Sequence, residues 1–376
     1  FGPAPIPYVV LVRASTLSAS PLFSGLNAME LWNNLLGLAQ LGLIKLEKDE
    51  IRSQQDNPLA DTLSIHPLVR EINRNHPEVA ENFDEYLRLV TVLISDLVRE
   101  RYPLDTAEVE TGLAMAAHGT AALQMILERT DRPTEPEIIE LALETAIMCA
   151  VGAVVSGWWD QADEMLSFID NFCTVRGYDS DPSYQIMAQV LRIVIAPHRR
   201  MSQTAAQLEL LIATRRAREL YGDNDLLVLG LRGSLALAFA HSRWRQHAAL
   251  ELRDIWWATE TNFSGDSETD ALVLIYQLAF LRARATKATL RDDPAAVERE
   301  LFALADAVKA KVGETHVLTV VAHFLLGAAL MELGRLDTAE AHWRQVHHAV
   351  ARRLSLVHPI TINASRWLSL TLERLN

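Results

Sequence analysis

Cysteine, glycine and proline are scarce in this 376-residue chain. Its only two cysteines, Cys149 and Cys173, cannot build a disulfide framework. A reducing compartment, the cytoplasm, is therefore expected. The chain also lacks an uninterrupted apolar run of the ~20 residues that a membrane-spanning helix needs. We therefore expect a soluble protein without a membrane partner.

Basic residues are also in deficit, with 35 Lys and Arg against 48 Asp and Glu and a formal net charge of −13. A protein that binds the phosphate backbone of nucleic acids needs clustered Lys and Arg, so nucleic acid is not an expected partner. Hydrophobic residues make up 49% of the chain, which excludes wholesale disorder. The length favours either several domains or one extended repeat array.

Motifs for catalysis and metal binding are missing as well. The sequence has no G-x4-G-K-[ST] phosphate loop, no G-x-S-x-G elbow, no H-E-x-x-H and no CxxC. His342, His347 and His348 lie close together in sequence, but not at metal-ligand spacing, so surface or packing roles are favoured. We expect neither an enzyme nor a metal centre, and no cofactor within this chain.

Strand-like alternation is confined to residues 43–47 and 62–66, which flank a polar stretch that contains Asn57-Pro58. This pattern predicts a β-hairpin. Helical patterns precede it at 28–41 and follow it at 67–74. Helix, hairpin and helix are the outline of a winged-helix domain, which we assign to residues 1–76. The chain begins with Phe rather than Met, so we expect a truncated start, with the piece cut from a longer protein.

A repeat follows in residues 77–376. A short turn phrase ending in alanine recurs with spacings of 43, 43, 48 and 43 residues, at Ala162, Ala205, Ala248, Ala296 and Ala339. A second marker keeps nearly the same period, at Gly177, Gly222, Gly265, Gly313 and Ser355. Two markers with one period predict about six stacked helical hairpins, with glycine at the chain reversals. The last segment, residues 359–375, is expected to cap the open end. The fold class is therefore all-α.

The final unit resembles a tetratricopeptide repeat. Leu326-Gly327 and, twelve residues after the glycine, Ala339-x3-Trp343 follow that family's pattern, although His323 and Leu330 replace its Trp and Tyr. The long period is similar to that of kinesin light chains, whose boundary motif is partly matched around His316 and at His358-Pro359. The resemblance implies a right-handed superhelix that binds a protein or peptide in its concave groove.

The first 76 residues resemble the winged-helix end of bacterial STAND (NB-ARC) signalling ATPases, which often carry such repeats next. Pro5-Ile6-Pro7, the segment 35–44 and Ser64-Ile65-His66-Pro67-Leu68-Val69-Arg70 carry the resemblance. It implies that His66 contacts the phosphate of ADP in the parent protein, where ATP or ADP is the cofactor. It also implies an upstream nucleotide-binding domain in the same chain as a partner, and release of autoinhibition when the repeats bind their ligand.

Residues that could bind a partner have plainer alternatives. Four arginines on the expected first helices could receive an acidic peptide or simply extend to solvent: Arg192, Arg232, Arg282 and Arg284. The tryptophan pairs 158–159 and 256–257 could be ligand platforms or core residues, and His66 could merely end a strand.

Two other functions stay open. One is a stand-alone repeat scaffold or adaptor without a nucleotide switch. The other is a regulator whose winged helix touches DNA. Residues 28–41 contain no Lys or Arg, and residues 1–76 hold six basic against seven acidic residues, which disfavours DNA.

Overall fold

The structure is a computed structural model of the whole chain. It describes residues 5–11, 14–48, 61–74, 76–100, 115, 118–129, 133–176, 183–195, 202–239, 245–263, 265–288, 294–354, 356 and 358–375. The polar stretch with Asn57-Pro58 and the markers Gly177 and Ser355 lie outside these residues. The described chain is predominantly helical with one small sheet.

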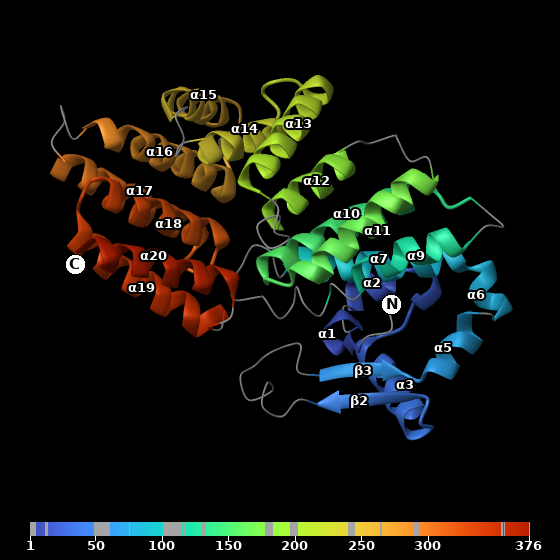
Figure 1. The fold of residues 1–376 in the computed structure, drawn as a ribbon. Helices are drawn as coiled ribbons and strands as arrows, with labels where there is room; N and C mark the ends of the chain where they lie inside the picture. Colours follow the sequence, from blue (N-terminus) through green and yellow to red (C-terminus); the bar gives the residue numbers. More distant parts are fainter. Residues whose placement is uncertain are drawn as a thin grey trace. The chain divides into compact units, whose positions relative to one another are not determined.

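The chain folds into two compact units (Figure 1). The first reaches Leu191 and the second starts at Arg192, so that the boundary falls within helix α12 (Ser183–Ile195). The predicted domain boundary at residues 76/77 lies inside the first unit, between two of its helices. This is because α7 (Phe83–Glu100) packs on α1 (Tyr8–Leu11) and α2 (Ala14–Ala19).

The sheet of the first unit is antiparallel with the strand order β1-β3-β2. The predicted hairpin is present as β2 (Ile44–Lys48) and β3 (Asp61–Ile65), with Ile44 opposite Ile65. The two-residue strand β1 (Ile6–Pro7) was not expected from the sequence, and it pairs with the other edge of β3. Ile6 and Leu63 are paired and buried, which anchors the sheet in the core.

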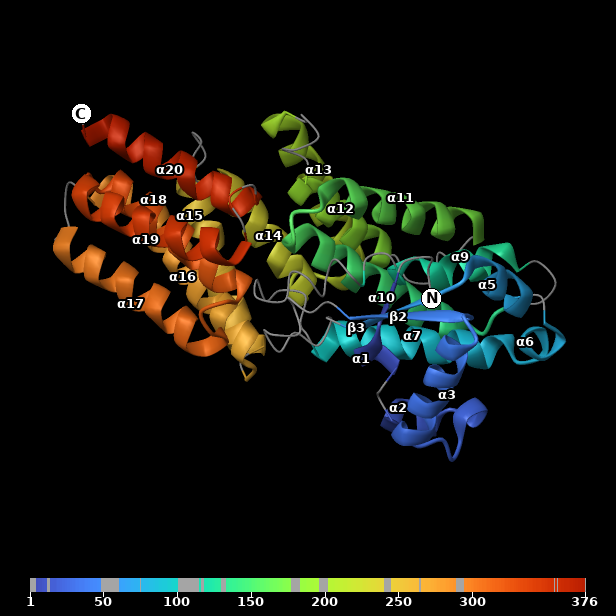
Figure 2. The same ribbon diagram turned by 90° about the horizontal axis from the view of Figure 1, so that it is seen from below.

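The helix before the hairpin, α3 (Ala28–Gln40), begins at a capping box formed by Asn27 and Glu30. The helix after it, α5 (Pro67–Arg74), has the predicted bounds. The remaining elements of this unit are η1 (Pro21–Phe23), α6 (Pro77–Glu81), α9 (Ala121–Glu128), α10 (Pro136–Val155) and α11 (Trp159–Arg176). Helix α10 packs against α7, α9 and α11, and Figure 2 shows α7 and α10 close together.

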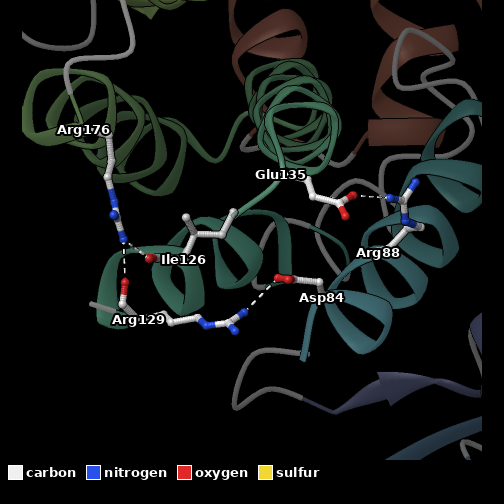
Figure 3. A network of polar contacts seen from close by, with 6 residues as sticks. All are labelled: Asp84, Arg88, Ile126, Arg129, Glu135 and Arg176. Carbon is white, nitrogen blue, oxygen red and sulfur yellow. Dashed lines mark hydrogen bonds and ion pairs between the residues drawn. The ribbon is translucent and has the colours of Figure 1, made fainter. Parts of the chain in front are cut away.

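A polar network ties these helices together (Figure 3). Arg176 of α11 donates to the carbonyl oxygens of Ile126 and Arg129, which caps the C-terminus of α9. Arg129 donates to Asp84 of α7 at 2.8 Å, and its guanidinium lies 4.5 Å from the ring centroid of Phe83. These contacts hold α7, α9 and α11 in register, so the network is structural.

Helix α10 corrects the expectation about membrane segments. It is 20 residues long with a mean hydropathy of 2.1 in its most apolar window, so by length and composition it could cross a membrane. The sequence reading missed it because Glu140 and Glu144 interrupt the apolar run. In the structure 56% of that window is buried, and Glu144 pairs with Arg99 of α7. These are the properties of a core helix.

The second unit is a succession of helices, each packed on the next, that Figures 1 and 2 show in yellow to red. Its helices are α13 (Gln203–Tyr221), α14 (Leu226–Phe239), α15 (Arg245–Phe263), α16 (Ser267–Ala288), α17 (Pro294–Val312), α18 (Val317–Glu332), α19 (Leu336–Leu354) and α20 (Pro359–Leu375). Helix α20 has the predicted bounds.

The glycine marker is confirmed at the chain reversals that the structure describes. Gly222, Gly265 and Gly313 have φ of 81°, 143° and 90°, conformations that a residue with a Cβ rarely adopts. Gly222 directly follows the last turn of α13, and Gly313 that of α17.

The alanine marker holds only in part. Ala162, Ala248 and Ala339 are buried in their helices, whereas Ala205 is half-buried and Ala296 is exposed. In α17 the buried positions are Leu301, Ala305 and Val308, so the alanine marker does not coincide with a buried position in this helix. The spacing before Ala296 is 48 residues, five more than the other spacings of this marker.

First helices of successive hairpins also contact each other. Helix α16 packs on α18, and α18 on α20. Gly233 of α14 allows the ring of Tyr276 of α16 to approach, since a Cβ at Gly233 would lie 2.5 Å from that ring. In the second unit, helices therefore pack on their second neighbour as well as on the next helix in the chain.

Candidate functional site

A cavity of about 360 Å³ lies within the second unit, between α13, α14 and α15. Its size falls in the range of small-ligand sites. It is lined by Leu211, Thr214, Arg215, Arg218, Arg232, Leu235, Ala236, Phe239, His247, Ala248 and Glu251.

The cavity has apolar walls. Leu235 and Ala236 lie about one turn before Phe239 on α14. Leu211 of α13 and the buried Ala248 of α15 complete the surface. Thr214 adds no free polar group, because its hydroxyl donates to the carbonyl of Leu210, one turn back in the same helix, at 2.7 Å. An apolar group could therefore be buried here without leaving this hydroxyl unsatisfied.

One side of the cavity is charged. The Nε of Arg232 donates to Glu251 at 2.7 Å, and its Nη1 donates to the carbonyl of Asp223 at 3.3 Å. The Arg232 side chain is 17% exposed, so this ion pair between α14 and α15 is largely shielded and fixes the wall of the cavity.

Two further arginines stand at the rim. Arg215 pairs with Glu219 at 3.0 Å, and Arg218 with Asp223 at 2.5 Å. The hydrogen bond from Arg218 lowers the pKa of the Asp223 carboxyl and raises that of Arg218, so both groups are charged at neutral pH. All four side chains are at least half exposed. Water therefore competes well for these pairs, which keeps the two arginines accessible to a ligand.

Three of the four predicted partner-binding arginines have side chains that the structure describes, and these three are not brought together into one site. Only Arg232 lines the cavity. Arg282 is buried and forms an ion pair with Glu332 of α18 at 3.1 Å, so it links two first helices. Arg192 lies in the last turn of α12 and already interacts with other groups. The side chain of Arg284 lies outside the described residues.

His66 is exposed at the start of α5. Its Nδ1 accepts the backbone N–H of Leu68 at 3.2 Å, and its own backbone N–H donates to the carbonyl of Leu43. A neutral imidazole that accepts at Nδ1 carries its proton on Nε2, which makes that atom a donor. His316 and His358 accept the N–H two residues on in the same way, at the starts of α18 and α20.

The predictions for the other histidines and tryptophans can also be placed. His342 is buried and its Nε2 lies 3.0 Å from the carbonyl oxygen of His323, which agrees with a packing role. Among the described residues, no group of three or more potential metal ligands occurs. In each tryptophan pair one ring is largely exposed, Trp158 by 49% and Trp257 by 69%. Neither lines the cavity.

Sequence reasoning missed most of the cavity. Arg215, Arg218, His247 and Glu251 were not among the predicted site residues. The run Arg215-Arg216-Ala217-Arg218, next to exposed leucines on the same helix, was the available signal.

No protein-family model matches this chain, and no curated protein matches it. The function therefore has to be argued from the helices and the cavity themselves.

Proposed function

We propose that the second unit is a ligand-binding array of tetratricopeptide-like hairpins in a right-handed superhelix, whose ligand is a protein or peptide. The cavity between α13, α14 and α15 carries this proposal, because it combines apolar walls with accessible arginines. Binding rather than catalysis is its role, since a partner needs only shape and charge complementarity here.

The packing of the last hairpin supports the repeat family. The motif residues Gly327 of α18 and Trp343 of α19 are in contact, and Ala339 is fully buried between the helices. Contacts between every second helix, in addition to those between consecutive helices, are the packing expected of a repeat array.

We further propose that the chain is the sensor half of a STAND-type regulator. The segment that ends at α5 contains a strand, two short helices, a longer helix and a hairpin in that order, with β1 beside β3. This order suits a winged helix. In the parent protein His66 would donate from Nε2 to a phosphate oxygen of ADP, while Leu68 holds its Nδ1. ATP or ADP would be bound by the upstream nucleotide-binding domain.

Ligand binding would act by population shift. The parent protein would alternate between a closed, ADP-bound state and an open, ATP-bound state. A ligand that binds the array more tightly in the open state than in the closed state shifts the equilibrium toward the open state. The size of the shift is set by the difference between the two binding free energies.

A stand-alone repeat scaffold is the second candidate, and one observation favours it. His66 caps its helix in the same way as His316 and His358, so helix capping alone accounts for a histidine at this position.

Two experiments separate the candidates. The reading frame on the 5′ side of the Phe1 codon should encode a P-loop ATPase; a frame without one overturns the STAND proposal. In that longer protein, His66→Asn keeps a capping side-chain oxygen but loses the imidazole donor, and should speed ADP release. The matched His358→Asn should not change ADP release, and equal effects of the two variants would contradict the phosphate contact of His66.

A further inference from the structure

One face of α13 carries an exposed apolar stripe. Leu208, Leu211 and Ile212 are 57%, 48% and 52% exposed, at positions i, i+3 and i+4 of one helix. These positions share a face. Leu211 also lines the cavity, so the stripe and the cavity form one continuous apolar surface.

The apolar surface formed by the stripe and the cavity is longer than the binding site of a small molecule needs to be. From Leu208 to Arg218 the helix advances by about 15 Å, or nearly three turns. A partner helix that lies along this length would place an apolar side chain every three to four residues, which is the mode of helix-in-groove recognition.

The end of the surface is basic. Arg215 and Arg218 follow the stripe in the last turns of α13. Their present partners, Glu219 and Asp223, form exposed ion pairs, which are worth little and can be exchanged for a partner's carboxylates. This basic end contrasts with the net charge of −13 of the chain, so the carboxylates of an acidic partner are complementary to the chain at this end.

We infer that α13 and the adjoining cavity dock an amphipathic helix of a partner protein, with a large apolar side chain in the cavity and acidic residues at one end against Arg215 and Arg218. This inference rests on the proposed function, since it specifies the peptide ligand of the array. Arg232 keeps its pair with Glu251 and shapes the cavity that receives the anchor.

The probe is a fluorescein-labelled peptide of about 16 residues, long enough to form a helix, with leucines on one face and three glutamates at one end. Fluorescence anisotropy with the 376-residue chain should show binding that weakens as salt is raised. A peptide with its leucines scrambled should not bind. A peptide with glutamine for glutamate should bind about tenfold more weakly.

Protein variants locate the contact. Arg215→Glu/Arg218→Glu should weaken binding about tenfold or more, and so should Leu211→Ser. Arg344→Glu on α19 is the matched control. Arg344 is also an exposed arginine, and it pairs with Glu340 one turn away in the same helix. This substitution should leave peptide binding unchanged.

Two results would overturn the inference: no binding of the leucine–glutamate peptide, or binding that none of the α13 variants changes. Either result would leave the upstream ATPase reading frame untouched, so failure of this inference is distinguishable from failure of the STAND proposal.

Discussion

Trp343 of α19 lies directly against the backbone of Gly327 of α18. A Cβ built on Gly327 would lie 2.5 Å from Cε2 and Cζ2 of the indole. The buried Trp343 also stacks on Trp367 of α20, with ring centroids 5.7 Å apart. The missing side chain of one residue thus lets the last hairpin close and receive the terminal helix.

Gly327→Ala should therefore destabilise the second unit by about 1–3 kcal/mol, because the indole has to shift in a packed core. The measurement is urea unfolding followed by tryptophan fluorescence. Gly230→Ala is the matched control, since a Cβ there meets nothing within 4 Å and alanine favours the helix. Equal destabilisation of both variants would contradict the packing argument.

Gly313→Ala tests the chain reversal rather than packing. A Cβ at Gly313 meets no atom within 4 Å, so the effect comes only from its φ of 90°. An L-residue in this region costs about 1–2 kcal/mol. Unfolding free energy should fall by that amount relative to the wild type, while Gly37→Ala within α3, equally open but without a positive φ, should show no loss.

The pair Arg282 and Glu332 should be strongly coupled. Both side chains are largely buried, at 9% and 18% exposed. Arg282→Met should cost about 3 kcal/mol, because a largely buried carboxylate loses this cation, whereas Arg282→Met/Glu332→Leu should recover most of that loss. Urea titration of the two single variants and the double variant measures the coupling. Additive losses would show that the pair contributes no mutual stabilisation.

Acid should weaken the last hairpin through His323. Burial lowers its pKa to about 4, helped by the nearby His342 and Lys309, while Asp306 and Glu314 act the other way. The unfolded chain, with a pKa near 6.5, then binds more protons below that pH. Stability is therefore full above pH ~6.5 and is lost by up to about 3 kcal/mol as the pH falls toward 4.

His323→Phe removes this titration and should flatten the fall in unfolding free energy between pH 6.5 and 4. The exposed His348→Phe is the control and should keep the wild-type slope. An unchanged slope in His323→Phe would assign the acid sensitivity to other groups.

Duplex DNA should bind no more tightly than a non-specific polyanion at physiological salt. Helix α3 contains no Lys or Arg and exposes Met29, Trp32 and Leu38 instead. Such a face gives no counterion release on a phosphate backbone. Nanomolar binding of a defined duplex, measured by anisotropy, would revive the DNA-binding alternative.

Local patterns allowed much of the fold to be predicted. The alternation of apolar and polar residues predicts the two hairpin strands, and the repeat period predicts the terminal helix. Helix α5 and the terminal helix each begin at the proline of a His-Pro pair. All four elements lie within about one residue of their predicted bounds. Strand β1 was not predicted, because a strand of two residues is too short to show an alternating pattern. Its partner β3 also lies far away in the sequence. The alanine marker has one irregular spacing, the 48 residues before Ala296, and this alanine is exposed in the structure.

The site was less predictable than the fold. A single sequence does not show which arginines are buried, so Arg282 was taken as a partner-binding candidate although it is held by Glu332. The cavity needs α13, α14 and α15 in place at once, and its lining residues are spread from Leu211 to Glu251. Only the arginine run on α13 was visible beforehand.

Hydrogen–deuterium exchange of the 376-residue chain, with and without the leucine–glutamate peptide, tests the central claim most directly. The account predicts slower exchange in α13 and in the facing parts of α14 and α15, and unchanged exchange in α18, α19 and α20. Protection confined to α18–α20, or no protection at saturating peptide, would contradict a ligand site at this cavity.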